Sequence, residues 1–282
     1  MGGESTGDVP DTGRRRRPPP PLRLASVESK RELSHALIEV VLAGAGLVGF
    51  DRPEPGASLR MVLPRSGAGS PLELPTWRGN EYLFDDGERP AVRTLTPLDV
   101  DPAEGRLTVW LVRGHDGTLA RWASDVTSGE EVAISGPGSG YRVDHGTQHL
   151  VVLGDLAAAA AVHDVIERAP AGCEVRTLVE CSAANAPDTM RHRDDVEWLD
   201  PRDGAPPGSA LVDRVRTLLA SVDGHGPARP DAITTRWWAA GEAASIQRLR
   251  TLFAESGVPR HHTHVRGYWR QGRPQPGDRR RP

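Results

Sequence analysis

The stretch Leu150-Val151-Val152-Leu153-Gly154-Asp155, with the alanine-rich residues 156–168 after it, decides the fold of the second half of the chain. Four consecutive apolar residues are typical of a strand that is buried on both faces, as the strands of parallel sheets are. Gly154 and Asp155 end this strand, and the alanine-rich segment favours a helix. A buried strand that leads directly into a helix predicts a βαβ unit, and therefore a parallel sheet.

Strands and helices continue to alternate after this unit. We expect further strands at 175–179, 196–199, 233–239 and 264–265, and helices at 209–219 and 243–256. Ser209 can cap the first of these helices, and Gly257 can end the second. The alternation predicts a parallel-sheet nucleotide-binding domain, in which a ligand lies at the carboxyl ends of the strands.

The first half of the chain carries a different pattern. Short runs rich in β-branched residues are separated by Gly, Pro and Asp, at 37–42, 59–63, 92–96, 107–112 and 131–134. Such runs predict an antiparallel sheet or barrel. The segment 65–88, which contains several Gly and Pro residues, is expected to form a long loop.

These patterns predict a β-barrel domain at 22–145 and an α/β domain at 146–272. The ends, 1–21 and 273–282, are rich in Pro, Gly and Arg, and we expect them to be disordered tails. The run Arg14–Arg17 could contact nucleic acid or an anionic lipid, but a solvated tail is the simpler interpretation. A barrel followed by a nucleotide-binding domain suggests two ligands that meet at the domain interface.

Composition limits the classes of function. The 282 residues carry a net charge of −3, so a basic surface for nucleic acid is not indicated. No apolar run reaches the roughly 18 residues of a membrane-spanning helix, and the N-terminus lacks the apolar core of a secretory signal. Cys173 and Cys181 are the only cysteines, which argues against a disulfide scaffold. We therefore expect a cytoplasmic protein without a membrane span, and the oligomeric state stays open.

Three histidines, His261, His262 and His264, lie close together near the C-terminus. No acidic residue or cysteine nearby has the spacing of a metal ligand. We predict no metal site there.

Four segments, in this order, match the motifs of one family. They are Arg93-Thr94-Leu95-Thr96-Pro97-Leu98; residues 114–123 with Gly129-Glu130 and Gly136-Pro137; residues 154–161; and Trp238 to Glu242, with Arg248-Leu249-Arg250 and Gly267-Tyr268-Trp269-Arg270-Gln271-Gly272 after it. Together they resemble the siderophore-interacting proteins, flavin reductases of the ferredoxin-reductase-like superfamily. The resemblance runs from about Leu22 to Gly272.

The resemblance implies an antiparallel Greek-key FAD-binding barrel, followed by a parallel-sheet NAD(P)-binding domain. It implies NAD(P)H as electron donor, FAD as cofactor and a ferric siderophore as small-molecule substrate, whose iron is released after reduction. This chemistry relies on positioning and on the flavin, so no catalytic acid or base is expected.

The same resemblance assigns cofactor-binding residues. Arg93 would contact the flavin diphosphate and Thr96 the polar edge of the isoalloxazine, while the backbone around Gly117 would receive the diphosphate. Trp122 is expected in the core, and Trp269 is expected to anchor the C-terminus. The full set of expected cofactor-binding residues is Arg93, Leu95, Thr96, Arg113, Gly117, Thr118, Leu119, Asp155, Gly241 and Glu242. Arg236 or Arg248 could bind a 2′-phosphate, so the choice between NADH and NADPH stays open.

The flavin motif departs from the family pattern. Leu95 stands where the family has a stacking Tyr and Leu98 where it has a second Arg, while Arg113 and Thr118 replace a His and a Pro. Loss of the aromatic stack forfeits about 0.5–1.5 kcal/mol, and loss of a charged hydrogen bond about 1.5–3 kcal/mol. Three functions therefore stay open. We favour an FAD-dependent ferric-siderophore reductase; the alternatives are a family member that has lost tight flavin binding and acts in binding or regulation, and a reductase for another acceptor.

Overall fold

The computed structural model describes residues 21–78, 81–113, 117–191, 193–220 and 234–273. The expected tails, apart from Pro21 and Arg273, lie outside these residues, as do Gly114 to Asp116 of the second motif. No helix in the described ranges is long and apolar enough to span a membrane.

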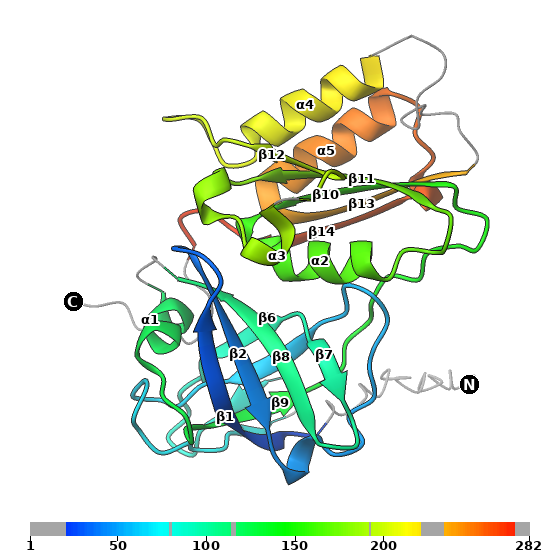
Figure 1. Cartoon of the computed structure of the whole chain (residues 1–282). Helices are drawn as coiled ribbons and strands as arrows, with labels where there is room; N and C mark the ends of the chain where they lie inside the picture. Colours follow the sequence, from blue (N-terminus) through cyan, green and yellow to red (C-terminus); the bar gives the residue numbers. More distant parts are fainter. Residues whose placement is uncertain (1–20, 79–80, 114–116, 192, 221–233, 274–282) are drawn as a thin grey trace, which may run out of the picture.

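The first part of the chain forms a seven-stranded antiparallel sheet that curls into a half-barrel (Figure 1). Its strands lie in the order β6-β3-β9-β1-β2-β8-β7, so β9 returns to lie between β1 and β3 as in a Greek key. The expected strands are confirmed here. The bounds are β1 Arg23–Glu32, β2 Leu37–Ala43, β3 Leu59–Val62, β6 Val92–Leu95, β7 Leu98–Asp101, β8 Arg106–Val112 and β9 Glu131–Ser135.

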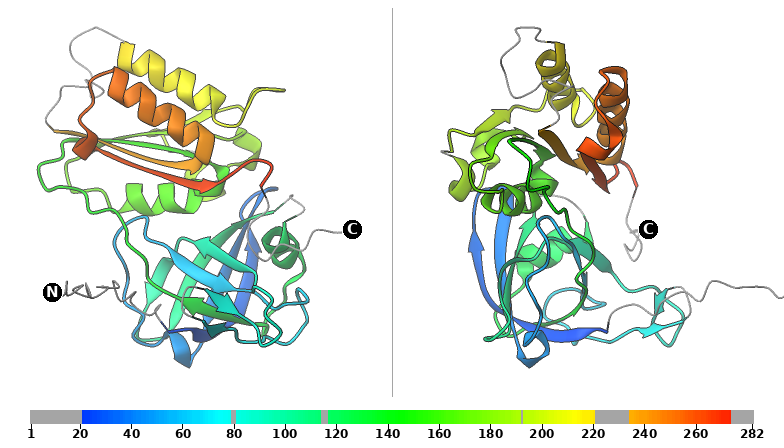
Figure 2. Two further views of the ribbon diagram at one scale, coloured as in Figure 1. Left: turned by 180° about the vertical axis from the view of Figure 1, so that it is seen from behind. Right: turned by 90° about the vertical axis from the view of Figure 1, so that its right-hand side faces the viewer.

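Several elements of the barrel were not expected from the sequence. In strand β1 only the side chains of Ala25 and Val27 are buried. The strand is held in the sheet by its pairing with both β2 and β9. The segment 65–88 is a long connection, as expected, but it contains the short hairpin β4 (Thr76–Trp77) and β5 (Tyr82–Leu83), which stands away from the barrel (Figure 2). Helix α1 (Thr118–Asp125) packs against the barrel through the buried Trp122, which confirms Trp122 as a core residue.

The second part forms a five-stranded parallel sheet in the order β12-β11-β10-β13-β14. The predicted fold class is thereby confirmed. The strands are β10 His149–Asp155, β11 Glu174–Glu180, β12 Val196–Leu199, β13 Thr235–Glu242 and β14 Thr263–Trp269. The proposed domain boundary near residue 145 falls in the segment between β9 and β10.

Helices cover both faces of this sheet. The short 3-10 helix η2 (Leu156–Ala158) and α2 (Ala159–Glu167) follow β10 on the face toward the barrel, whereas α4 (Ser209–Ala220) and α5 (Ala243–Glu255) cover the other face (Figure 1). The short α3 (Asp188–Arg191) follows β11. The start of α4 differs from expectation: Ser209 donates to the Pro206 carbonyl, and the buried Glu180 carboxylate accepts the N–H groups of Gly208 and Leu211.

Contacts across the domain interface fix the two sheets relative to each other. Asp164 of α2 is buried, and its carboxylate accepts the Gly56 N–H at 2.8 Å and pairs with Arg168 at 2.9 Å. Arg168 in turn donates to the Pro53 carbonyl at 2.7 Å. The Trp110 ring of β8 stacks on His163 of α2, with 4.9 Å between ring centroids. These contacts determine the shape of the space between the domains.

Candidate functional site

A cavity of about 730 Å³ lies between the two domains. Its size is within the range of small-molecule and cofactor sites. The barrel lines it with Arg93, Leu95, Trp110, Gly117 and Leu119, and the second domain with Asp155, Glu180, Tyr268 and Trp269. Residues from distant parts of the sequence therefore converge on one site.

The structure brings together only part of the expected site. Arg93, Leu95, Gly117, Leu119 and Asp155 line the cavity. The expected residues that do not line it are Thr96, Arg113, Thr118, Gly241 and Glu242.

Arg93 lies on β6, where it pairs in register with Met61. Its side chain is 4% exposed, and Nη1 donates to the Val92 carbonyl at 2.9 Å. A buried guanidinium that borders a cavity is suited to an anion, because its planar fork can donate hydrogen bonds in pairs.

The N-terminus of α1 opens on the same cavity. Gly117 is the N-cap residue of the helix and has no side chain with which to cap it. Gly117, Leu119 and Arg121 line the cavity, and a Cβ at Gly117 would meet no atom within 4 Å, so the approach to the backbone is open. The N–H groups and the positive dipole end of a first helical turn favour phosphate groups.

Leu95 and Tyr268 supply apolar surface from opposite domains. The Thr96 side chain does not line the cavity; it is buried and lies beside the Tyr268 hydroxyl. Burial raises the pKa of Tyr268 to about 12, so the phenol is neutral at physiological pH. Thr96 therefore contacts Tyr268 across the interface.

Asp155 ends β10 and joins three segments of the second domain. Its Oδ2 accepts the Trp269 indole N–H at 2.8 Å and the Glu242 N–H at 2.9 Å, and Oδ1 accepts the Ala158 N–H at 3.2 Å. Burial raises the pKa of Asp155 to about 6, against the lowering effect of these hydrogen bonds. Trp269 is thus anchored, as expected from the sequence.

Gly241 has a structural role beside Asp155. A Cβ at this position would come within 2.7 Å of Asp155 Oδ2. The position therefore excludes larger residues.

Glu242 caps α5. Its Oε2 accepts the N–H groups of Ala244 at 2.6 Å and Ser245 at 2.8 Å, and Oε1 accepts the Gln271 N–H at 3.4 Å. The side chain lines a neighbouring groove rather than the interdomain cavity. Because the carboxylate already occupies the start of α5, this helix offers no place for a phosphate.

Arg113 does not line the cavity, and its guanidinium is bound by the turn between β1 and β2. Its Nη1 pairs with Glu32 at 2.6 Å, and its Nε donates to the His35 carbonyl at 2.6 Å, both at the turn between β1 and β2. The expectation that Arg113 supplies charge to the cavity is therefore corrected, because the neighbouring hairpin holds its guanidinium.

Tyr268 and Trp110 also line the cavity, although neither was expected there from the sequence. Tyr268 belongs to the quoted Gly-Tyr-Trp-Arg ending, so a signal was present. Trp110 lies within a strand, and its place in the cavity depends on the packing of the two domains.

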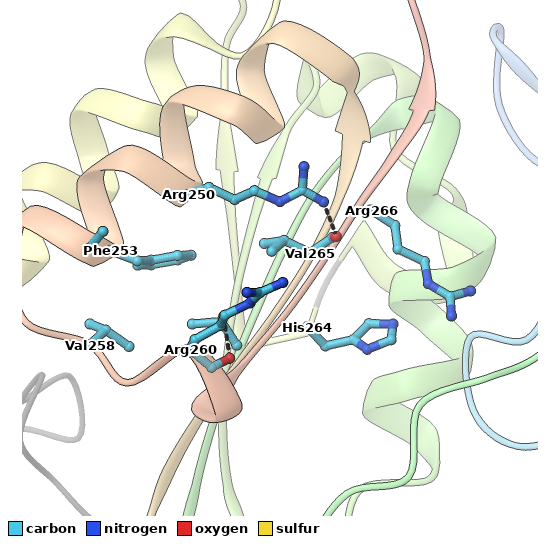
Figure 3. A pocket seen from close by; sticks show the side chains of 9 residues that line it. Arg250, Phe253, Val258, Arg260, His264, Val265 and Arg266 are labelled. Carbon is cyan, nitrogen blue, oxygen red and sulfur yellow. Dashed lines mark hydrogen bonds between the residues drawn. The ribbon is translucent and has the colours of Figure 1, made fainter.

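A separate cavity of about 690 Å³ lies beside α5 and the edge strand β14 (Figure 3). Its arginines are Arg250, Arg260 and Arg266, and Arg250 donates to the Val265 carbonyl at 2.6 Å. Charged side chains along an edge strand protect it from pairing with other chains. Burial lowers the pKa of the adjacent His264 to about 4, and in the described part of the chain no group of three or more His, Cys, Asp or Glu residues could hold a metal ion.

Comparison with known proteins agrees with this architecture. Residues 26–141 match the family model of the siderophore-interacting FAD-binding domain, and residues 147–272 match that of the siderophore-interacting protein. The chain belongs to the siderophore-interacting protein family.

Members of the family and related reductases resemble the chain over most of its length. Ferric vibriobactin reductase ViuB of Vibrio cholerae is 23% identical over 257 residues, covering 89% of this chain and 90% of ViuB. An uncharacterized protein of Mycobacterium tuberculosis is 28% identical over 284 residues, covering 90% of this chain and 92% of the relative. The crystal structure of a siderophore utilization protein from T. fusca superposes with a TM-score of 0.71 at 26% identity, covering 91% and 95% of the two chains.

Phthalate dioxygenase reductase shares the fold alone, with a TM-score of 0.58 at 14% identity over 87% of this chain and 68% of the reductase. The siderophore-interacting family and its ferredoxin-reductase-like fold are thus both established for this chain. An oxidoreductase with an FAD-binding domain is the general class to which the comparisons point.

Proposed function

We propose that this siderophore-interacting protein is an NAD(P)H-dependent flavoprotein that reduces the iron of a ferric siderophore. The observation that carries the proposal is the interdomain cavity, because Arg93 and the start of α1 in the barrel and the carboxyl edge of the parallel sheet all line it. A flavin bound to the barrel and a nicotinamide bound to the second domain would face each other there.

The residues that line the barrel side of the cavity fit FAD. Arg93 and the N-terminus of α1 would hold the diphosphate. Leu95 and Tyr268 would bind the isoalloxazine through apolar contact. When bound there, FAD supplies the ability to accept a hydride and to release single electrons.

The second domain would bind and orient the electron donor. Asp155 holds the ends of β10, β13 and β14 together through its hydrogen bonds, and it thereby keeps Trp269 at the cavity. Glu180 holds the loop before α4 at the same edge. Both carboxylates accept N–H groups of the protein. We therefore assign them a structural role and no role in proton transfer to the substrate.

The overall reaction needs no proton donor from the protein. NAD(P)H gives up two electrons and a proton, and two ferric ions each accept one electron, which yields NAD(P)⁺, two ferrous ions and H⁺. The siderophore then releases the softer ferrous ion. The similarity to ViuB, which is named a ferric vibriobactin reductase, supports this class of substrate. A reaction that consumes NAD(P)H also fits the cytoplasmic location expected from the sequence.

A second candidate function is binding or regulation without tight FAD. Leu95 provides no aromatic stack, and Leu98 is buried with Leu33 and Leu37 in the cluster between the domains, where it cannot contact a phosphate. These observations favour weaker flavin binding than the family motif provides.

FAD uptake and turnover separate the two candidates. We expect the purified protein to bind added FAD and to oxidise NADPH or NADH when a ferric chelate is present. A protein that takes up no FAD and oxidises neither nucleotide would support the binding or regulatory function instead.

A further inference from the structure

The turn Arg270–Arg273 lies at the edge of the sheet where a dinucleotide is expected. Figure 2 shows this end of the described chain turning from β14 toward the barrel. The turn lines both the interdomain cavity and a neighbouring groove of about 720 Å³, and Pro206 and Pro207 line both as well. The chain leaves β10 and β13 toward opposite sides of the sheet, so this edge contains the topological switch point at which dinucleotides bind.

The turn is held in place by the second domain. The Arg273 N–H donates to the Arg270 carbonyl at 3.3 Å, and Gly272 adopts a φ of 70°, which few other residues adopt. The residues beside Arg270 are anchored: Trp269 donates to Asp155 at 2.8 Å, and the Gln271 N–H donates to Glu242 at 3.4 Å. Both arginines are thus presented from one fixed turn.

Other arginines near this edge are already engaged. Arg202 pairs with Asp213 at 2.6 Å, and Arg248 donates to the Pro207 carbonyl at 2.6 Å. Arg236 stands at the start of β13, at the opposite end of the sheet, and pairs with Asp144 at 2.8 Å. The sequence-based candidates Arg236 and Arg248 are therefore unsuited to a phosphate of the dinucleotide.

Arg270 and Arg273 differ from these residues. Both are exposed, and neither forms an ion pair within the part of the chain that the structure describes. Glu180 and Glu242, which end β11 and β13 at this edge, both accept backbone N–H groups. They therefore do not offer the free carboxylate that recognises the ribose 2′-hydroxyl of NADH in many dinucleotide sites.

We infer that Arg270 and Arg273 form the binding site for the 2′-phosphate of NADPH, so that the protein prefers NADPH to NADH. Guanidinium groups donate paired hydrogen bonds to phosphate oxygens, and a 2′-phosphate is the only group that distinguishes the two donors. The inference rests on the proposed function, since it assigns the donor of the same site.

Nucleotide fragments test the phosphate site without flavin or turnover. Isothermal titration calorimetry of the full-length protein with 2′,5′-ADP and with 5′-ADP compares ligands that differ in the 2′-phosphate. We expect 2′,5′-ADP to bind about 10- to 100-fold more tightly than 5′-ADP, because the two guanidinium groups would donate charged hydrogen bonds to the 2′-phosphate. The double variant Arg270→Ala/Arg273→Ala is expected to lose this difference and to keep its affinity for 5′-ADP. Arg260→Ala, which changes an exposed arginine of the separate cavity beside α5, is the matched control and is expected to retain the difference.

Equal affinities for the two nucleotides in the unchanged protein would overturn the inference, and so would a preference that survives in the double variant. FAD uptake on the same preparations separates this inference from the proposed function. A protein that takes up no FAD contradicts the reductase, whereas one that binds FAD and oxidises NADH as efficiently as NADPH contradicts only the phosphate site.

Discussion

Leu95 and Leu98 stand where the family pattern has a tyrosine and an arginine, but their surroundings differ. Leu95 lines the cavity. Leu98 is 3% exposed and packs with Leu33 and Leu37 between the domains. An arginine at position 98 would place a charge in an apolar cluster, which is costly without a partner. Only position 95 can therefore be returned to the family pattern without disturbing the core.

Leu95→Tyr is expected to tighten FAD binding, because a tyrosine ring can stack on the isoalloxazine. An aromatic pair contributes about 0.5–1.5 kcal/mol, which corresponds to an affinity gain of about 2- to 13-fold. Titration of the apoprotein with FAD, followed by flavin fluorescence, measures the change. Leu74→Tyr is the control, since Leu74 is 50% exposed and does not line the cavity. Equal affinities in the Leu95 variant and the unchanged protein would contradict the assignment of this residue.

The carboxyl of Asp155 makes stability depend on pH in a direction opposite to that of most carboxylates. Its pKa is raised to about 6 in the folded protein, whereas an unfolded aspartate has a pKa of about 3.9. Between these values the folded state binds more protons than the unfolded state, so this group adds stability as the pH falls and loses that contribution as the pH rises through 6. From pH 7 to pH 5 the gain is about 1 kcal/mol.

The free energy of unfolding in urea at pH 5 and pH 7 measures this effect, with Asp155→Asn as the comparison. Other carboxylates also titrate, so the quantity of interest is the difference between the two proteins. We expect the unchanged protein to gain stability relative to the variant at pH 5. A difference that stays constant between the two pH values would show that Asp155 does not take up a proton in this range.

At the level of elements, α2 connects the parallel sheet to the barrel. Its Asp164 accepts the Gly56 N–H and pairs with Arg168, and it is 3% exposed. Asp164→Ala leaves both donors without this partner, and we expect a loss of about 1.5–3 kcal/mol in the free energy of unfolding. FAD affinity is expected to fall as well, because the cavity depends on the arrangement of the two domains.

Chemical denaturation and FAD titration of Asp164→Ala measure both effects. Asp213→Ala provides the control, since Asp213 pairs with Arg202 and Arg216 at the surface and is expected to contribute no more than about 1 kcal/mol. Similar effects of the two substitutions would argue against a special role of α2 at the interface.

The elements also show what the sequence can and cannot predict. The run Leu150–Leu153 predicted a strand that is buried on both faces, and β10 is at the centre of the parallel sheet. Strand β1 was missed, because most of its side chains are exposed and its pairing with β2 and β9 holds it. Helix α1 was missed because only eight residues form it.

For the site, local motifs pointed to Arg93 and Gly117, and both residues line the cavity. They could not show that Thr96 contacts Tyr268 or that Glu242 caps α5, because these contacts depend on three-dimensional packing. The turn Arg270–Arg273 reaches the cavity because β14 pairs beside β13. The residues around the turn do not by themselves predict which strand β14 will pair with.

For the whole molecule, the two domains each supply half of one cavity. The barrel contributes Arg93 and the start of α1, and the parallel sheet contributes its carboxyl edge with Asp155 and Tyr268. Neither half is a complete site for electron transfer between two cofactors. We therefore propose that electrons pass from NADPH to ferric iron through FAD bound between the domains.

Anaerobic mixing in two steps tests this path of the electrons. The FAD-loaded protein is mixed first with one equivalent of NADPH and then with a ferric siderophore, while flavin absorbance is followed and ferrous iron is captured by a chromogenic chelator. We expect loss of the oxidised flavin absorbance in the first step, and its return in the second with two ferrous ions formed per NADPH. Flavin absorbance that NADPH leaves unchanged, or reduced flavin that the ferric siderophore does not reoxidise, would contradict it.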